Sequence, residues 1–331
     1  MNDKLQMSVS PHITAKATTR SIMIEVLIAL LPAVVASIIF FGFYSLFLII
    51  LSVGGSLFGE ALYNILRKRK QTIGDFSAVV TGVLLAMNLP ATVPFYVPII
   101  GGFFATMLVK MLFGGIGRNF ANPALTARIF LLLAWAGFMT SFVSPINWAN
   151  GEAFKYFSCA LKGADGVVTV TSATPLSGGN ATLLQMFLGQ TGGSLGETSA
   201  LALIIGGVYL AVRKIIDWKI PVVFIATTAL FTLIFNGASN VLPAILSGGL
   251  MLGAIFMATD YSTSPNTFIG TLIYAFGCGF LTALIRRYGS YPEGVSFAIV
   301  LMNIVTPLLD KFIIPKTFGK PKKEKKAKEA K

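Results

Sequence analysis

The stretch SIMIEVLIALLPAVVASIIFFGF, residues 21–43, decides what kind of protein this is. Its only charged side chain is Glu25, and the rest of the run is almost entirely apolar. A helix rises about 1.5 Å per residue and the bilayer core is about 30 Å thick, so about 20 apolar residues cross it. The run is therefore predicted to be a membrane-spanning helix.

The rest of the chain repeats this pattern. Of the 331 residues, 55% are hydrophobic and 12% charged, about half the charge of a soluble domain, which is roughly 25%. None of the apolar runs alternates as a membrane barrel strand does. We predict an all-α polytopic membrane protein with about ten transmembrane helices, over residues 21–43, 44–66, 76–90, 95–113, 122–141, 197–213, 220–236, 241–258, 267–285 and 294–312.

Two of the runs are interrupted, and they resemble each other. Run 76–90 ends in Asn-Leu-Pro, and run 241–258 leads into a polar turn that ends in a proline. Serine, methionine and proline follow at similar spacings in both. Broken helices in corresponding places indicate an inverted repeat of five plus five helices. The predicted parts are a cytoplasmic N-terminal arm (1–20), a first membrane repeat (21–141), an extracytoplasmic loop (142–196), a second membrane repeat (197–312) and a basic cytoplasmic tail (313–331).

The charges predict which way the chain crosses the membrane. The formal net charge is +13, with 26 Lys and Arg. If the N-terminus is cytoplasmic, nearly all of them fall on the cytoplasmic side, as the positive-inside rule requires. The exceptions are Lys155, Lys162, Arg286 and Arg287. Because the basic residues are sorted by membrane side and not gathered in one patch, the sequence predicts lipid contact and no nucleic-acid binding.

Two cysteines, one histidine and no CxxC pair make a metal or iron–sulfur centre in this chain improbable. There is also no GxGxxG stretch that follows a strand and opens a helix, so no dinucleotide site is predicted. The chain is expected not to be catalytic alone. Any nucleotide or metal chemistry would come from partner subunits.

Several acidic residues fall in or beside the apolar runs. An ionised carboxylate inside a bilayer is costly, so Glu25 and Glu60 need partners or mark an ion path, and Arg67 is the expected partner of Glu60. Asp75 and Glu197 precede apolar runs and are predicted to cap helices. Asp260 lies at the broken eighth run and is a candidate functional residue.

The stretch GGIGRNFANPA, residues 114–124, is the most distinctive segment beside the membrane. Its glycines allow close backbone approach, and Asn122 before a proline is a suitable start for the fifth helix. Two interpretations stay open: a turn between helices, or the wall of a flavin or quinone-like pocket or a subunit contact. In the second, Gly117, Arg118, Asn119 and Asn122 are the candidate binding residues.

The outward loop contains VTSATPLSGG, residues 170–179. Its TSAT, residues 171–174, resembles the acceptor motif at which flavin transferases attach FMN through a phosphoester to the last threonine. Together with GGIGRNFANPA, with GETSA at 196–200 and with ATDYSTSP at 258–265, it occurs in the order typical of the RnfD and NqrB family of flavin-carrying membrane subunits. The chain resembles the RnfD branch of the family, which has the shorter N-terminus.

This resemblance implies a fold and a set of cofactors. The fold would be a urea-transporter-like inverted repeat. Thr174 would carry covalent FMN beside Ser172 and Ala173, and a riboflavin would be held noncovalently nearer the cytoplasm. Arg286 or Arg287 would then offset the FMN phosphate, because a guanidinium matches phosphate oxygens; alternatively, both arginines reach outer lipid headgroups.

The resemblance also implies a function and partners. The chain would be a membrane flavoprotein subunit of an ion-translocating ferredoxin:NAD+ oxidoreductase (Rnf) complex in the bacterial cytoplasmic membrane, moving Na+ or H+. Its partners would be a flavin-carrying G-type subunit, iron–sulfur B- and C-type subunits, membrane A- and E-type subunits, and a flavin transferase. The alternatives are an NqrB-type subunit of a Na+-pumping NADH:quinone oxidoreductase, or a small-solute channel or secondary transporter, which the broken helices alone would favour.

Overall fold

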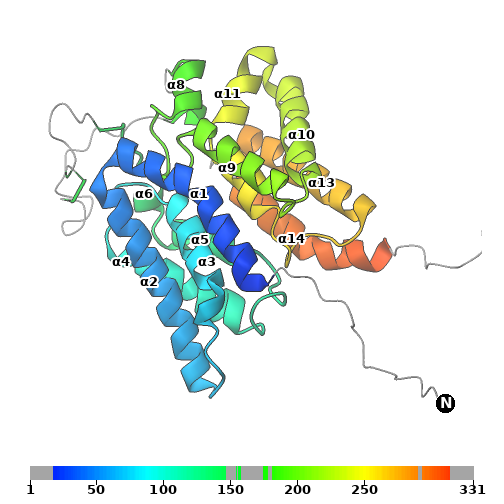
Figure 1. Cartoon of the computed structure of the whole chain (residues 1–331). Coiled ribbons are helices and arrows are strands. Elements are labelled where there is room, and N and C mark those ends of the chain that lie inside the picture. Colours follow the sequence, from blue (N-terminus) through cyan, green and yellow to red (C-terminus); the bar gives the residue numbers. More distant parts are fainter. Residues whose placement is uncertain are drawn as a thin grey trace, which may run out of the picture.

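A computed structural model of the chain describes residues 18–146, 154, 156–157, 174–177, 181–289 and 293–313. Within these ranges the regular elements are helices (Figure 1), joined by turns and irregular segments that include an isolated bridge between Pro90 and Ser194. The predicted all-α class is confirmed for the described part of the chain.

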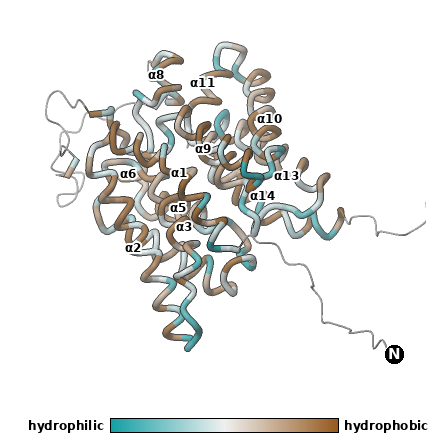
Figure 2. Tube along the Cα trace, in the orientation of Figure 1, coloured by the Kyte–Doolittle hydropathy of each residue, from teal (hydrophilic) through white to brown (hydrophobic). Residues whose placement is uncertain are grey.

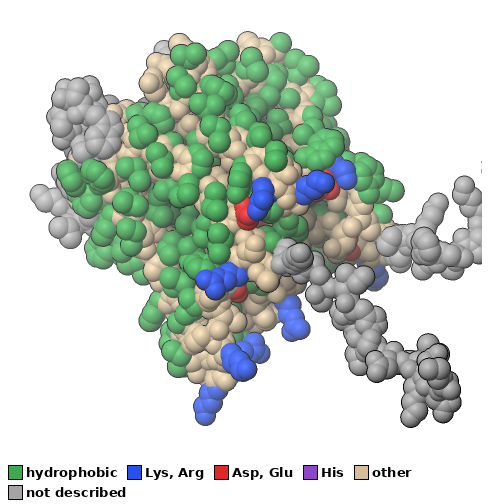
Figure 3. Space-filling view, in the orientation of Figure 1, with side chains coloured by type: hydrophobic (Ala, Val, Ile, Leu, Met, Phe, Trp, Pro, Cys, Tyr) green, Lys and Arg blue, Asp and Glu red, His purple; other side chains and the backbone are tan. Residues whose placement is uncertain are grey.

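In the described part of the chain, five helices are long and apolar enough to cross a membrane. They are α1 (Thr19–Phe41), α2 (Phe43–Leu66), α10 (Lys219–Asn236), α13 (Phe268–Tyr288) and α14 (Val295–Phe312). Brown, apolar segments run through most of the trace in Figure 2. In Figure 3 apolar side chains cover most of the visible face, and the few charged ones lie in its middle and lower parts. Such an apolar exterior fits a multi-pass membrane protein.

The other predicted runs form shorter or broken helices. Among them, the eighth run is bent by 62° between residues 238–246 and 250–257. These helices are α3 (Ser77–Met87), α4 (Tyr96–Phe103) continued by the π-helix η2 (Phe104–Met111), α5 (Pro123–Ala134), α9 (Ala200–Val212), and α11 (Val241–Leu246), which is followed by α12 (Leu250–Leu252) and the π-helix η8 (Gly253–Met257). Each of the ten apolar runs thus contains helix among the described residues. The predicted break of the eighth run is present as the 62° bend, whereas the third run is one unbroken short helix, α3, that ends at Met87 before Asn88-Leu89-Pro90.

Minor helical segments connect these elements. They are η1 (Ile73–Asp75), α6 (Ala136–Met139), η6 (Pro175–Ser177), α8 (Leu183–Leu188) and η7 (Ala238–Asn240). The capping box of α8, in which Thr182 and Gln185 satisfy each other's backbone N–H groups, explains why this short helix forms in the loop before the second half.

Close helix pairs form the core. α2 packs along α4, α10 along α13, and α1 against α9. A Cβ added at Gly102 of α4 would overlap the backbone of Ser52, and one added at Gly206 of α9 would overlap the backbone of Ala29. Small residues at helix contacts let backbones approach closely in lipid, where no hydrophobic force joins the helices.

Candidate functional site

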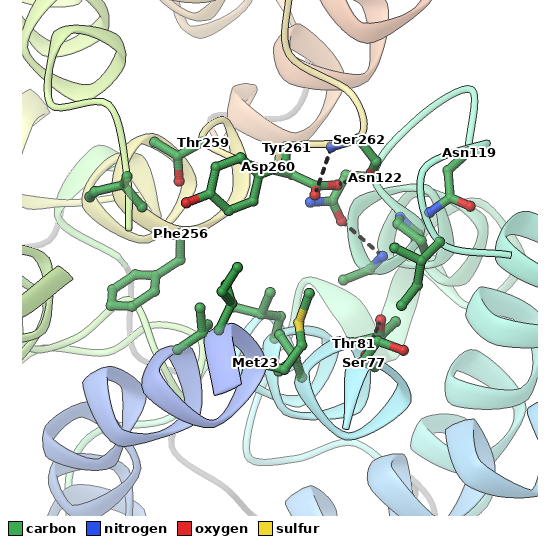
Figure 4. A pocket seen from close by; sticks show the side chains of 18 of the residues that line it. Met23, Ser77, Thr81, Asn119, Asn122, Phe256, Thr259, Asp260, Tyr261 and Ser262 are labelled. Atoms are coloured by element: carbon green, nitrogen blue, oxygen red, sulfur yellow. Dashed lines mark hydrogen bonds between the residues drawn. The ribbon is translucent and has the colours of Figure 1, made fainter. Parts of the chain in front are cut away.

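A cavity lies where the short third run and the bent eighth run meet. It measures about 100 Å³ and is lined by α1, α3, the end of η2, the start of α5, the end of α9 and the turn after η8. Figure 4 shows Asp260, Ser262 and Asn122 along one side of it and Met23, Thr81 and Ser77 along the other. Both π-helices border it, and π-turns inside helices are frequent at functional sites.

Asn122 fixes one wall of this cavity. Its Oδ1 accepts hydrogen bonds from the backbone N–H groups of Ala124 (3.0 Å) and Leu125 (3.4 Å), which caps α5 as the sequence predicted. Its Nδ2 donates to the carbonyl of Met257 at 3.2 Å. One side chain therefore ties the start of the fifth helix to the end of the broken eighth run.

The rest of the Gly-rich stretch divides into two groups. Asn119 lines the cavity, and its Oδ1 is buried with no hydrogen-bond partner. Gly117 has a φ of +81°, which only glycine adopts readily, and it lies with Arg118 on the exposed side of the turn. Of the four residues predicted here, Asn119 and Asn122 are brought to the cavity, whereas Gly117 and Arg118 are not among its lining residues.

Asp260 lies at the cavity in the turn between η8 and α13. Its carboxylate accepts hydrogen bonds from the Ser262 hydroxyl (2.9 Å), the Ser262 N–H (3.3 Å) and the Thr263 hydroxyl (3.4 Å). Burial raises the pKa of Asp260 above its usual range, against the lowering effect of these bonds. The structure thus places Asp260 beside Asn122, 138 positions earlier in the chain.

A buried cation at the cavity was not foreseen. Lys110 of η2 is 2% exposed, and its Nζ lies 2.8 Å from Glu60 Oε2 while also donating to the Ser77 hydroxyl. The Thr72 hydroxyl donates to the other oxygen of Glu60. The predicted pairing of Glu60 with Arg67 is therefore wrong. The signal available in the sequence was a lone lysine in an apolar run, which needs a buried counter-ion.

Glu25 also has its partners inside the protein. Its carboxylate accepts hydrogen bonds from Arg213 and Tyr209, both at the end of α9. α1 and α9 are thereby joined by an ion pair as well as by close packing, which meets the expectation that this carboxylate needs a partner.

A second cluster of polar side chains, around Arg128, lies next to Thr174. Arg128 of α5 forms ion pairs with Glu197 (3.4 Å) and Glu293, and it donates a hydrogen bond to Ser296. Glu197 therefore neutralises a buried guanidinium, and α9 is capped by Ser199, which accepts from the Ala202 N–H. The predicted helix cap at Glu197 is wrong, whereas Asp75 does accept from the Ser77 N–H at 2.9 Å.

Thr174, at the start of η6, is 8% exposed and borders a small cavity of about 10 Å³. Glu197, Thr198, Gly248 and Glu293 line the same cavity. Ser172 and Ala173, the predicted neighbours of the acceptor, lie outside the described residues. The structure thus brings the predicted acceptor threonine to the buried ion pairs of Arg128.

The two predicted phosphate-binding arginines have different surroundings. Arg286 donates to the carbonyls of Ala244 (2.6 Å), Ser247 (3.1 Å) and Gly248 (3.1 Å), which closes the bend between α11 and α12. Its Nε is buried and has no partner. Arg287 is exposed. Since Gly248 borders the Thr174 cavity, Arg286 lies close to the predicted acceptor.

These features define a class: a multi-pass membrane protein in which a short helix and a bent one border an amphipathic cavity, with a buried ion cluster beside Thr174. The comparisons give the particular family. Residues 6–319 match the model of the NQR2, RnfD, RnfE family, and the chain belongs to this family.

Named relatives cover almost the whole chain. It is 45% identical to the D-type subunit of the Na(+)-translocating ferredoxin:NAD(+) oxidoreductase complex of Acetobacterium woodii, over 99% of this chain and 100% of that protein. It is 40% identical to the D-type subunit of the proton-translocating ferredoxin:NAD(+) oxidoreductase complex of Clostridium ljungdahlii, over 95% and 96%. The D-type subunit of an ion-translocating oxidoreductase complex of Halorhodospira halophila is 35% identical, over 95% and 96%.

Proposed function

We propose that this chain is the D-type membrane subunit of an ion-translocating ferredoxin:NAD+ oxidoreductase complex and passes electrons as part of it. The observation that carries the proposal is the end-to-end similarity to relatives with that name. Relatives named as D-type subunits favour this over an NqrB-type subunit, and none of those cited is named as a solute channel or transporter. As in the sequence prediction, the soluble redox sites and metal centres belong to partner subunits.

The five-plus-five inverted repeat is part of the proposal. Corresponding helices make corresponding contacts: the second packs along the fourth in each half, α2 with α4 and α10 with α13. In each half a cation of the fourth helix also binds the third run, Lys110 at Ser77 at the start of α3 and Arg286 at Ser247 at the bend between α11 and α12. These corresponding contacts support an inverted repeat of the two halves.

The membrane orientation is inferred from the basic residues and from the position of Thr174. Residues 67–70, which are all basic, follow α2 at the end of the molecule away from α8 and α11 (Figure 1). We infer that this end faces the cytoplasm of a bacterium, with both termini, and that Thr174 faces outward. The inference rests on the charge asymmetry and on Thr174 packing at the α11–α12 bend, near the opposite end.

We infer two flavins. Covalent FMN at Thr174 is supported by the acceptor-like sequence and by Arg286, which donates a hydrogen bond to the carbonyl of Gly248 at the border of the Thr174 cavity. We assign a noncovalent flavin to the larger cavity, because apolar walls from α1, α3 and α9 suit a flat ring and Asn119 offers an unpartnered amide oxygen to its polar edge. At about 100 Å³ the cavity is smaller than a flavin, so its walls would have to move apart to admit one. Bound flavins would supply electron exchange in single or paired steps.

The acceptor is tested by expressing the chain with a flavin transferase and measuring in-gel flavin fluorescence after denaturation. Wild type and the control Thr182→Val, an exposed helix cap, should fluoresce, and Thr174→Val should not. The mass of peptide 163–187 should include FMN in the wild type and in Thr182→Val, and not in Thr174→Val. Fluorescence that persists in Thr174→Val would move the bond elsewhere, and none in any variant would remove the covalent flavin from the proposal.

The larger cavity is tested by the flavin that acid precipitation releases from the purified chain. Asn119→Leu fills the cavity with an apolar side chain and should lower released riboflavin or FMN at least several-fold. Asn240→Leu, an exposed site beyond the far end of α10, is the matched control. Equal release from both variants would contradict the assignment.

A further inference from the structure

The small cavity beneath Thr174 contains oxygen atoms without partners. Thr198 is 3% exposed, and its Oγ1 has no hydrogen bond. Glu293 Oε2 accepts a hydrogen bond from Arg128, while Glu293 Oε1 is buried and unpartnered. Both residues line the cavity. Buried polar atoms are nearly always satisfied, so two unpartnered oxygens on residues that line one cavity indicate that it holds a water or an ion.

The size and the donors of this cavity limit what it binds. Its volume of about 10 Å³ is that of roughly one water molecule. Its polar side chains present carboxylate and hydroxyl oxygens, which hard cations prefer. A single small cation or a water fits, and a larger ligand does not.

The charges around the cavity decide whether it holds a cation or a water. Four described charged side chains act on one another here: Arg128 and Arg286 against Glu197 and Glu293. With all four ionised, their formal charges cancel, which leaves no excess for an ion in the unmodified chain. Burial raises the pKa of Glu197 to about 7, so this balance holds above that pH. A phosphodiester at Thr174 would add one negative charge at the wall of the same cavity. One monovalent cation would restore neutrality, and a water would not.

We propose that the cavity bounded by Thr174, Thr198 and Glu293 binds one monovalent cation of the sodium class when Thr174 carries a flavin phosphate. This rests on the covalent flavin of the proposed function. Each carboxylate keeps one oxygen on Arg128, and Glu293 Oε1 and Thr198 Oγ1 coordinate the ion. Covalent flavin and cation thereby stabilise each other's binding, since each lowers the electrostatic cost of the other.

The test is thermal unfolding of the full-length flavinylated chain in detergent, with NaCl titrated against choline chloride at constant ionic strength. Sodium tenfold above its dissociation constant should raise Tm by about 2–4 °C. The response should vanish in Thr198→Val, which removes the oxygen and keeps the shape. It should persist in Thr282→Val, whose buried hydroxyl donates to Cys278 away from the cavity. It should also be absent from Thr174→Val, which lacks the phosphate.

The opposing outcomes are distinct. A flavinylated wild type with no sodium response, or one equal to that of Thr198→Val, would overturn the cation site in favour of a water. Stabilisation by lower pH and not by sodium would show that a proton balances the charge and would equally overturn it. A chain without covalent flavin would instead defeat the proposed cofactor at Thr174, which the fluorescence measurement reports separately.

Discussion

At the residue scale, the charged side chains inside the apolar body are used in pairs. Glu60 is fully buried against Lys110, and Arg128 is held by two glutamates. Removing one partner of such a pair leaves a buried charge without compensation, which costs far more than the pair contributes. The variants that reveal most are therefore those that remove one charge and those that remove both.

Lys110→Met should destabilise the chain by about 3–5 kcal/mol, because it leaves the Glu60 carboxylate buried and unpaired. Thermal or denaturant unfolding in detergent measures the loss. Lys219→Met, which breaks a partly exposed pair with Asp217, should change stability by less than about 1 kcal/mol. The double variant Glu60→Gln/Lys110→Met should recover part of the loss, and equal losses in single and double variants would contradict the pairing argument.

These pairs also show where sequence reasoning stops. Glu60 and Lys110 are 50 residues apart in the sequence. Glu197 and Glu293 lie 69 and 165 residues after Arg128, with which they pair. Local spacing favoured Arg67 for Glu60 because it lies two helical turns away. Only the packing of α2 against η2 shows that Lys110 is nearer. By contrast, the cap at Asn122 depends on adjacent residues and was predictable.

At the scale of elements, the helices were predictable because each is fixed by its own apolar run, with breaks at proline, glycine and asparagine. The cavity between the helices was only partly predictable from the sequence. Asn119, Asn122 and Asp260 stood out by composition and by the family motifs, whereas Lys110 and Ser77 depend on how α3 and η2 meet. Which helix faces approach closely is likewise a property of packing, and glycine substitutions test it.

Gly102→Ala should destabilise the α2–α4 contact by about 1–3 kcal/mol, because the added methyl group overlaps the backbone of Ser52. Gly54→Ala is the matched control in α2, where nothing lies within 4 Å of the added carbon. Unfolding in detergent compares the two. The control should equal or slightly exceed wild type, since alanine is the better helix former, and a similar loss in both would argue against close packing as the cause.

At the scale of the whole molecule, the apolar exterior and the uneven charges define how the protein lies in its membrane. The proposed topology is tested by single cysteines in a background where Cys159 and Cys278 are replaced. Lys68→Cys should be protected from a membrane-impermeant maleimide in intact cells, and Leu184→Cys in α8 should react. Both positions are exposed in the structure, so burial would not explain a difference. The reverse pattern would invert the orientation.

Arg128 has one more consequence. It belongs to the first half of the chain, and both of its acidic partners belong to the second. The halves therefore recognise each other through side chains and do not depend on the loop that connects them. A gene divided at residue 160, expressing residues 1–160 and 161–331 as separate polypeptides, should yield a complex that copurifies. Arg128→Leu should lower the yield of the copurified complex and not abolish it, because α1 still packs against α9 and Glu25 still pairs with Arg213 across the two fragments.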